Sequence, residues 1–416
     1  MRYWLETLGC PKNQVDSDKL GALLESQGYL RSGSPDSADL VVVNTCAFVE
    51  AARQESIDTI LDLAGRRSEG ARLAVTGCLA ERYGAELAAA LPEVDVVAGF
   101  GVPVTLGSRP GTEPALPSFD LLNLPRPPSG APWAYIKVAE GCDRRCGFCA
   151  IPSFRGPQRS RSRASILSEV DALGVEEVVL VAQDLASYGR DTGAKDLVGL
   201  VRDVASRVAR VRLLYLYPSE LTEGLIEVIG ETGCPYFDLS LQHVSRSHLR
   251  RMRRWGDGAR FLERVERIRA VLPDAAFRSS FIVGYPGETE EDHDRLLEFL
   301  DAAELDWAGF FAYSAEEGTH AVGLPGRVPD RLVGERLAEA GERQDAITAR
   351  RRRALVGSTV RVLVDEPSVG RSHREAPEID GIIKLAGEAA VGSWVDVVVT
   401  GAEGPDLEAR TVVGVA

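Results

Sequence analysis

The segment EGCDRRCGFCAIPSFRG, residues 140–156, carries three cysteines in a C-x3-C-x2-C pattern, Cys142, Cys146 and Cys149. A structural zinc site would need a fourth cysteine or histidine near this run, and the sequence offers none there. A thioredoxin-like pair would account for Cys146 and Cys149 but would leave Cys142 without a role. An iron–sulfur cluster with one iron left free of protein ligands accounts for all three thiols. The pattern therefore favours an open cluster over the two alternatives.

The sequence around this segment predicts a partial βα barrel. Six strand candidates, separated by amphipathic helical stretches, occupy 133–139, 177–183, 211–217, 236–242, 276–283 and 306–313. Six units are fewer than the eight of a closed barrel, so we expect an open side. Gln183, Gln242 and His243 close two of the strands, which would place them with the cysteine segment at the barrel mouth. A purely structural role remains open for all three residues.

A second set of cysteines precedes the barrel. Three strand candidates occupy 2–9, 39–45 and 72–77, and they alternate with helical stretches at 16–27, 50–65 and 80–91. This alternation predicts a parallel sheet, and each strand runs into a cysteine: Cys10, Cys46 and Cys78. Because the carboxyl ends of parallel strands meet at one edge, we expect these thiols to share a metal site. The seventh cysteine, Cys234, is interpreted as a buried core thiol.

The fold class expected is α/β, in three parts. Residues 1–107 form a parallel α/β domain, and the proline- and glycine-rich residues 108–132 form a linker. Residues 133–356 form the partial (βα)6 barrel together with a long charged helix from residue 330. Residues 357–416 contain short alternating strands with glycine turns, which predict a small antiparallel β-barrel.

The composition limits the class of protein. The 416 residues carry a net charge of −14, which argues against a general nucleic-acid binder. No apolar run reaches the roughly 18 residues of a membrane span, and the N-terminal residues lack the pattern of a signal peptide. We therefore expect a cytoplasmic protein without a membrane partner. In that reducing compartment, seven cysteines are metal ligands or catalytic thiols rather than disulfides.

The cysteine segment, with Phe148 before its last cysteine, resembles the signature of the radical S-adenosylmethionine (SAM) superfamily. The resemblance implies that Cys142, Cys146 and Cys149 hold a [4Fe-4S] cluster whose fourth iron binds the amino and carboxylate groups of SAM. It also implies a 5′-deoxyadenosyl radical that abstracts hydrogen from an unactivated carbon. By the same analogy Phe148 packs beside the adenine of SAM.

Three further segments resemble the N-terminal domain of the methylthiotransferase family: LGCPKNQVDSD, NTCAFVEAARQES and TGCLAERY. In that family three cysteines hold a second open [4Fe-4S] cluster, and these cysteines match Cys10, Cys46 and Cys78. The terminal residues resemble the family's TRAM module, so the resemblance covers almost the whole chain. It implies that one cluster generates the radical and the other carries the sulfur to be inserted.

The family has two branches, one acting on a transfer RNA adenosine and one on an aspartate of the twelfth small-subunit ribosomal protein. GCPKN, AQDLASYG and GRSHREAPEIDG resemble the ribosomal branch. Residues 357–416 hold five basic and ten acidic side chains, which is a poor surface for RNA phosphates and a good one for a basic protein. The sequence therefore favours the ribosomal protein as the substrate.

The expected reaction replaces a hydrogen on the aspartate β-carbon with a methylthio group. The resemblance implies two SAM molecules, a low-potential one-electron donor such as flavodoxin or ferredoxin, and a monomeric enzyme. No side chain is expected to act as a catalytic nucleophile. The alternatives are an adenosine methylthiotransferase of transfer RNA and, from another class, a non-enzymatic iron–sulfur electron carrier.

Overall fold

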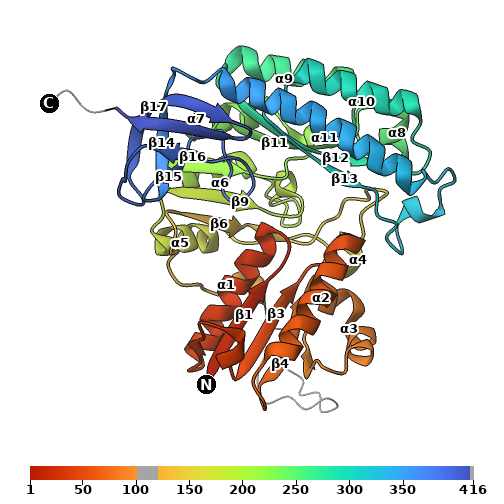
Figure 1. The fold of residues 1–416 in the computed structure, drawn as a ribbon, viewed down its shortest axis with the longest axis vertical. Coiled ribbons are helices and arrows are strands. Elements are labelled where there is room, and N and C mark those ends of the chain that lie inside the picture. The colour runs from red at the N-terminus through yellow and green to blue at the C-terminus, as the bar shows by residue number, and fades with distance from the viewer. Residues whose placement is uncertain (101–119, 413–416) are drawn as a thin grey trace.

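The computed structural model describes residues 1–100 and 120–412, and it contains two α/β parts and a terminal β-barrel (Figure 1). The predicted boundary at residue 107 and most of the predicted linker, residues 108–119, lie outside the described residues. In the part of the chain that is described, no helix combines the length and apolarity needed to cross a membrane.

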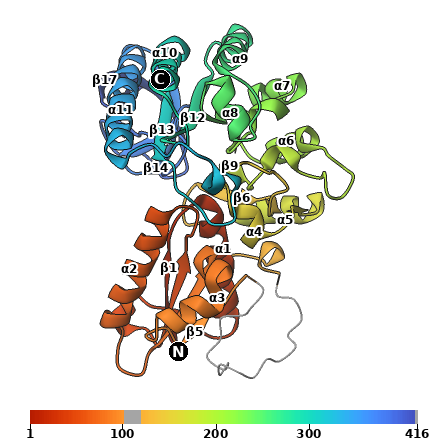
Figure 2. The same ribbon diagram turned by 90° about the vertical axis from the view of Figure 1, so that its right-hand side faces the viewer.

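The N-terminal part is a five-stranded, all-parallel sheet in the order β2-β1-β3-β4-β5. Its strands are β1 (Arg2–Thr7), β2 (Leu30–Arg31), β3 (Leu40–Thr45), β4 (Arg72–Gly77) and β5 (Val96–Val97). Its helices are α1 (Pro11–Ser26), α2 (Glu50–Arg66) and α3 (Cys78–Ala90). Helix α1 packs on one face of the sheet and α2 and α3 on the other. Figure 2 shows α1 and α2 on opposite sides of β1. The parallel sheet was predicted, whereas the two-residue edge strands β2 and β5 were not.

One helix start was predicted wrongly. Helix α1 begins at Pro11 and not at residue 16. Cys10 occupies the N-cap position with extended backbone, and Pro11 at the first helical position has its φ preset for a helix. The first turn lacks the apolar periodicity that indicates a helix, because Lys12, Asn13 and Gln14 are polar.

The central part contains six parallel strands, as predicted. They are β6 (Trp133–Lys137), β9 (Glu177–Val181), β10 (Arg210–Leu213), β11 (Tyr236–Gln242), β12 (Ala276–Val283) and β13 (Trp307–Ala312). They form two sheets, β10-β9-β6 and β11-β12-β13, joined by a parallel bridge between Leu216 and Leu239. Among the described residues no pairing joins β6 to β13, so the barrel is open on one side.

Helices cover the outside of this partial barrel, with α9, α10 and α11 side by side in Figure 1. The helices of this part are α4 (Ile151–Arg155), α5 (Arg163–Leu173), α6 (Leu197–Ala205), α7 (Glu223–Glu231), α8 (Arg246–Arg251), α9 (Gly258–Val271), α10 (Glu290–Ala303) and α11 (Asp330–Arg353). A two-stranded antiparallel ribbon of β7 (Ala139–Glu140) and β8 (Arg159–Ser160) closes the base of the cysteine segment. Short 3-10 helices occupy Pro35–Ser37, Leu121–Asn123, Leu185–Ser187, Pro218–Glu220 and His320–Gly323.

The C-terminal part is a closed barrel in the order β14-β15-β16-β18-β17. Its strands are β14 (Thr359–Glu366), β15 (Val369–Arg371), β16 (Ile383–Leu385), β17 (Trp394–Glu403) and β18 (Asp406–Thr411). The predicted small antiparallel barrel is confirmed, with one parallel pairing, that of β16 with β18. Strand β17 forms an antiparallel hairpin with β18, and β18 therefore runs beside β16 in the same direction as β16.

A loop of this terminal barrel closes the base of the central one. This base loop, residues 372–382, joins β15 to β16 and inserts Ala376 into a core formed at the start of the central strands. The hydroxyl of Tyr135 donates to the carbonyl of Pro377 at 3.0 Å, and the indole of Trp307 donates to that of Arg374 at 2.7 Å. The mouth at the opposite, carboxyl ends of the strands is left for the functional site.

Candidate active site

The three N-terminal cysteines follow β1, β3 and β4, at the carboxyl edge of the sheet as predicted. Glycines precede two of them, with positive φ at Gly9 (+92°) and Gly77 (+90°). A Cβ on Gly9 would lie 2.9 Å from Cys46 Sγ, and one on Gly77 would lie 2.6 Å from the backbone of Thr45. The close approach of the strand ends that brings these thiols together therefore depends on glycine at both positions.

Asn13 ties the three strand ends to helix α1. Its amide nitrogen donates to the carbonyl of Leu8 at 2.9 Å and to that of Thr45 at 3.0 Å. Its amide oxygen lies 3.8 Å from Cys78 Sγ, and its own backbone N–H donates to the carbonyl of Cys10 at 2.8 Å. One buried side chain therefore fixes the positions from which all three thiols extend.

The second set, Cys142, Cys146 and Cys149, lies at the mouth of the partial barrel in the segment closed by β7 and β8. The backbone N–H of Gly147 donates to the carbonyl of Met252 at 2.8 Å, which holds this segment against the residues that follow α8. A Cβ on Gly147 would lie 2.9 Å from the hydroxyl of Tyr285. The segment is therefore packed too closely for any larger residue at that position.

The spacing of the thiols is unsuited to a single metal ion. Three thiolates around one ion, with metal–sulfur bonds of about 2.3 Å, would lie roughly 3.8 Å apart. Among residues 1–100 and 120–412, which include all six thiols, neither set has its three sulfur atoms within 4.8 Å of one another. A cluster places each thiolate on a different iron and so suits wider spacing.

Positive side chains contact the barrel thiols. Arg254 donates to Cys146 Sγ at 3.4 Å, and the backbone N–H of Arg144 donates to Cys142 Sγ at 3.4 Å. Both guanidiniums lie 4.0 Å from the centre of the Tyr217 ring. Arg144 is in turn held by a charged hydrogen bond to Asp184 at 2.6 Å. These contacts favour the thiolate form that a metal ligand requires.

Burial opposes ionisation of these thiols until a metal binds. It raises the pKa of Cys142 to about 11 and that of Cys149 to about 12. Burial also raises the pKa of Cys46 to about 12. Cys10 differs: burial alone would raise its pKa, but the charges of Lys12 and Arg155 outweigh burial and hold the pKa below its ordinary value. Metal binding must therefore displace protons from most of the ligands.

A buried ionic network connects the two sets of thiols. Arg155, six residues after Cys149, donates to Cys78 Sγ at 3.0 Å and to the amide oxygen of Asn13 at 2.7 Å. Its other terminal nitrogen donates to Glu140 at 3.0 Å, and Glu140 accepts from Gln183 at 2.6 Å. Cys78, Arg155, Glu140 and Gln183 therefore form one continuous chain of contacts from the N-terminal sheet to the barrel mouth.

Two further charges complete this network. Lys137 bonds to Glu140 at 2.5 Å and also pairs with Asp16, which accepts from Arg155 at 3.3 Å. Burial alone would raise the pKa of Glu140, but Arg155 and Lys137 lower it to about 2. The sequence reasoning missed this network. Its one visible signal was an arginine within the same short segment as the barrel cysteines, which is too common a residue to single out.

The three residues predicted to contact a cofactor lie at or near the mouth. Gln183 uses its amide nitrogen on Glu140, while its buried oxygen has no partner within the described part of the chain. Gln242 is partly exposed, ends β11 at a break in strand register and has φ +72°, a strained value for a residue other than glycine. Phe148 is partly buried against the main core. Cys234, only 1% exposed, belongs to the apolar core.

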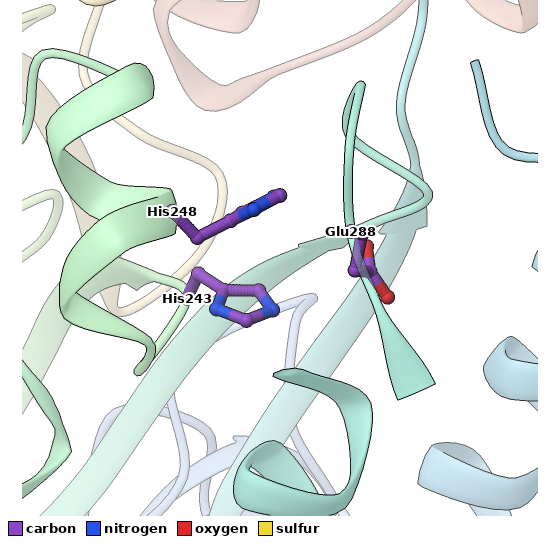
Figure 3. Close-up of side chains that lie close together, drawn as sticks. All are labelled: His243, His248 and Glu288. Atoms are coloured by element: carbon purple, nitrogen blue, oxygen red, sulfur yellow. The ribbon is translucent and has the colours of Figure 1, made fainter. Parts of the chain in front are cut away.

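His243 belongs to a separate cluster with His248 and Glu288, in which two imidazoles and a carboxylate point toward one another (Figure 3). One ligand atom from each lies within 4.8 Å of the others, and all three residues are buried. The backbone N–H of Ser245 donates to His243 Nδ1 at 3.1 Å, which leaves the hydrogen of the neutral ring on Nε2. Arg336 donates to Glu288 at 3.1 Å and already balances its charge.

This arrangement argues against a cation site, because one ring nitrogen carries a hydrogen and the carboxylate is paired. The Nε2 atoms of both histidines have no hydrogen-bond partner among residues 1–100 and 120–412. Burial, and for His243 the neighbouring His248, lowers the pKa of His243 to about 3, and burial lowers that of His248 to about 4. Both rings are therefore neutral at physiological pH, and His243 has a structural role rather than one at the mouth.

Three family profiles together match most of the chain: Uncharacterized protein family UPF0004 over residues 2–99, the Radical SAM superfamily over 136–300 and the TRAM domain over 356–412. Among curated proteins, the ribosomal protein uS12 methylthiotransferase RimO of Moorella thermoacetica is 45% identical, with 96% of each chain covered. The protein of that name from Streptomyces coelicolor is 41% identical over 99% of this chain and 96% of its own. Among solved structures, the radical SAM methyltransferase TsrM of Kitasatospora setae, 16% identical, aligns over 75% of this chain and 74% of its own with a TM-score of 0.48.

Proposed function

Because the chain belongs to the ribosomal protein uS12 methylthiotransferase family of radical SAM enzymes, we propose that it attaches a methylthio group to the β-carbon of an aspartate of uS12. The family assignment gives the enzyme one [4Fe-4S] cluster and SAM. The aspartate, the second cluster and the residues that hold each group are part of this proposal.

Cys142, Cys146 and Cys149 are proposed to hold the cluster that binds SAM, and Cys10, Cys46 and Cys78 the second cluster. When bound, these groups supply a carbon radical and the sulfur for insertion, so no side chain need act as a nucleophile. Arg254 and the backbone of Arg144 stabilise the first set of thiolates, and Arg155 stabilises Cys78. Gln183, Gln242 and Phe148 are proposed to position SAM at the mouth.

One observation carries the proposal: Arg155, from the segment of the barrel cysteines, donates to Cys78 of the N-terminal set and to Glu140, so the segments that carry the two sets of three cysteines are in contact. An electron carrier has no need of two ligand sets that each lack a fourth protein ligand. The acidic terminal barrel, with ten acidic and five basic residues over 357–416, favours a basic ribosomal protein over transfer RNA. Both alternatives are therefore less well supported.

Three further statements extend the proposal. The radical reaction consumes an electron, so we propose a low-potential donor such as flavodoxin or ferredoxin. A monomer suffices because one chain supplies both thiol sets. Because the proposed substrate is a ribosomal component, we also propose that the enzyme acts in the cytoplasm.

Mass spectrometry of uS12 and of transfer RNA from a strain lacking this gene tests the substrate. We expect uS12 to lose the mass of one methylthio group while transfer RNA adenosines keep theirs, and complementation restores the modification. Loss of the adenosine modification with intact uS12 would overturn the proposal. Anaerobic reconstitution followed by an assay for 5′-deoxyadenosine tests the electron carrier, which would contain clusters but cleave no SAM.

A further inference from the structure

Lys12 is the one lysine of this chain whose ammonium has no carboxylate partner among residues 1–100 and 120–412, a range that contains all five lysines. Lys19 pairs with Glu169 at 3.4 Å, and Lys137 pairs with Glu140 at 2.5 Å. The other two are also paired: Lys195 with Glu220 at 2.6 Å and Lys384 with Asp406 at 3.3 Å. Lys12 therefore needs a separate explanation.

The ammonium of Lys12 lies in the interior between the two α/β parts of the molecule. It comes from the first turn of α1, two residues after Cys10, and sits 3.6 Å from the centre of the Tyr215 ring, which follows β10. The ring attracts the cation but accepts no ordinary hydrogen bond from it. Both residues are partly exposed, so a ligand can reach the ammonium. A half-desolvated cation without an acceptor is complementary to an anion.

The carboxylate of Asp238, beside Tyr215 on the barrel side, is already hydrogen-bonded. Asp238 accepts from the backbone N–H of Tyr215 at 2.9 Å and from Arg278 at 3.1 Å. Arg278 in turn balances this charge together with that of Asp380. The remaining anionic neighbour is the thiolate of Cys10, whose pKa Lys12 lowers and which is proposed to be a cluster ligand. A carboxylate partner for Lys12 therefore has to come from outside the described chain.

The ring that Lys12 contacts lies close in the chain to a ring beside the barrel thiols. The ammonium of Lys12, two residues after Cys10, lies over the ring of Tyr215. The guanidinium of Arg254, which donates to Cys146 Sγ, lies over the ring of Tyr217. These tyrosines are two positions apart, a span of at most about 7 Å of chain. A group bound to Lys12 is therefore held where the N-terminal and barrel sites meet.

We infer that Lys12 determines specificity by binding the side-chain carboxylate of the substrate residue, with Tyr215 holding the ammonium in place. The inference rests on the proposed function and deepens it: the chemistry of this position selects an anionic target residue, as aspartate is. The ammonium has three N–H donors, which can donate to the two carboxylate oxygens. An uncharged isostere such as asparagine would leave the cation unpaired.

A double-mutant cycle tests the contact. The reconstituted enzyme and its Lys12→Met and Lys12→Arg variants are titrated anaerobically with whole uS12 and with uS12 carrying asparagine at the target position. Lys195→Met, which removes a lysine already paired with Glu220, is the matched control. Iron content is measured first for every variant, and methylthiolation of uS12 by the unaltered enzyme is checked by mass spectrometry.

We expect asparagine to weaken binding to the unaltered enzyme and to the Lys195→Met control about tenfold or more, and to leave binding to Lys12→Met unchanged. Lys12→Arg should retain part of the discrimination. Equal discrimination by Lys12→Met and the unaltered enzyme would overturn the inference, and so would loss of iron from Lys12→Met, because Lys12 would then serve the metal ligands. Failure of the unaltered enzyme to modify uS12 would instead overturn the proposed function, and the inference with it.

Discussion

The approach of Gly77 to strand β3 gives a quantitative test of how the N-terminal site is built. Gly77 has φ +90° and ψ −161°, a backbone region almost restricted to glycine, so alanine there costs about 1–3 kcal/mol in strain. Its new methyl group would also lie 2.6 Å from the backbone nitrogen and oxygen of Thr45, with which Gly77 is in register. Overpacking of this kind costs a further ~1–3 kcal/mol.

Gly70 provides the matched control. It has φ +84° in the same part of the molecule, but a methyl group there would meet nothing within 4 Å. Gly70→Ala therefore has only the conformational cost of about 1–2 kcal/mol. The difference between the two variants isolates the contact of Gly77 with Thr45, which positions Cys78.

Hydrogen exchange of the β3 and β4 amides measures this difference locally, without assuming that a chain of several parts unfolds in one step. At about 1.4 kcal/mol per factor of ten, Gly77→Ala should speed exchange by roughly thirtyfold to ten-thousandfold and Gly70→Ala by about fivefold to thirtyfold. Gly77→Ala should also lose half of the bound iron, while Gly70→Ala keeps all of it. If both variants exchange alike and retain full iron, the close approach of β4 to β3 does not position the thiol.

Three further predictions concern other residues. Arg155→Met removes the N–H···S contact to Cys78 and should lower the reduction potential of the cluster proposed there by a few tens of mV, and Arg155→Lys should lower it less. A redox titration followed by electron paramagnetic resonance measures the potential, and an unchanged value would contradict this role of Arg155. Burial lowers the pKa of His243 to about 3 and those of His248 and His373 to about 4, so below pH 6.5 the unfolded chain binds protons that the folded chain does not. Stability in urea titrations should therefore be level above pH 6.5 and fall by up to ~1.4 kcal/mol per histidine per pH unit below it, and His248→Leu should lower that slope by about a third. Cys78→Ala should halve the iron content and abolish the methylthio product but retain deoxyadenosine formation, whereas Cys234→Ala should retain all of the iron; equal iron loss in the two would argue against the assignment of ligands.

The sequence predicts those parts of the fold that local patterning determines. All six barrel strands and three strands of the N-terminal sheet are found where alternating apolar runs indicated them. The convergence of Cys10, Cys46 and Cys78 was predictable as well, since the carboxyl ends of parallel strands share one edge. Cys234 likewise lies in the core, as its apolar neighbours suggested.

The remaining features depend on contacts between residues far apart in sequence. Arg155 meets Cys78 across 77 positions, and no pattern near either residue indicates the pairing. The parallel seam between β16 and β18 follows from the path of the base loop, not from the strand sequences. Lys12 stands out only when the other lysines are seen to be paired. Such features become visible when the fold has brought the charges together.

The base loop bears on how this architecture can be recombined. The terminal barrel contributes Ala376 to the core of the central barrel, and its backbone carbonyls at Arg374 and Pro377 receive hydrogen bonds from Trp307 and Tyr135. Two genes crossed at residue 356 would therefore encode a chimera whose halves meet at a mismatched core. The base loop therefore has to match the aromatic side chains at the starts of the barrel strands. The terminal barrel evolves together with the central barrel and is not an exchangeable domain.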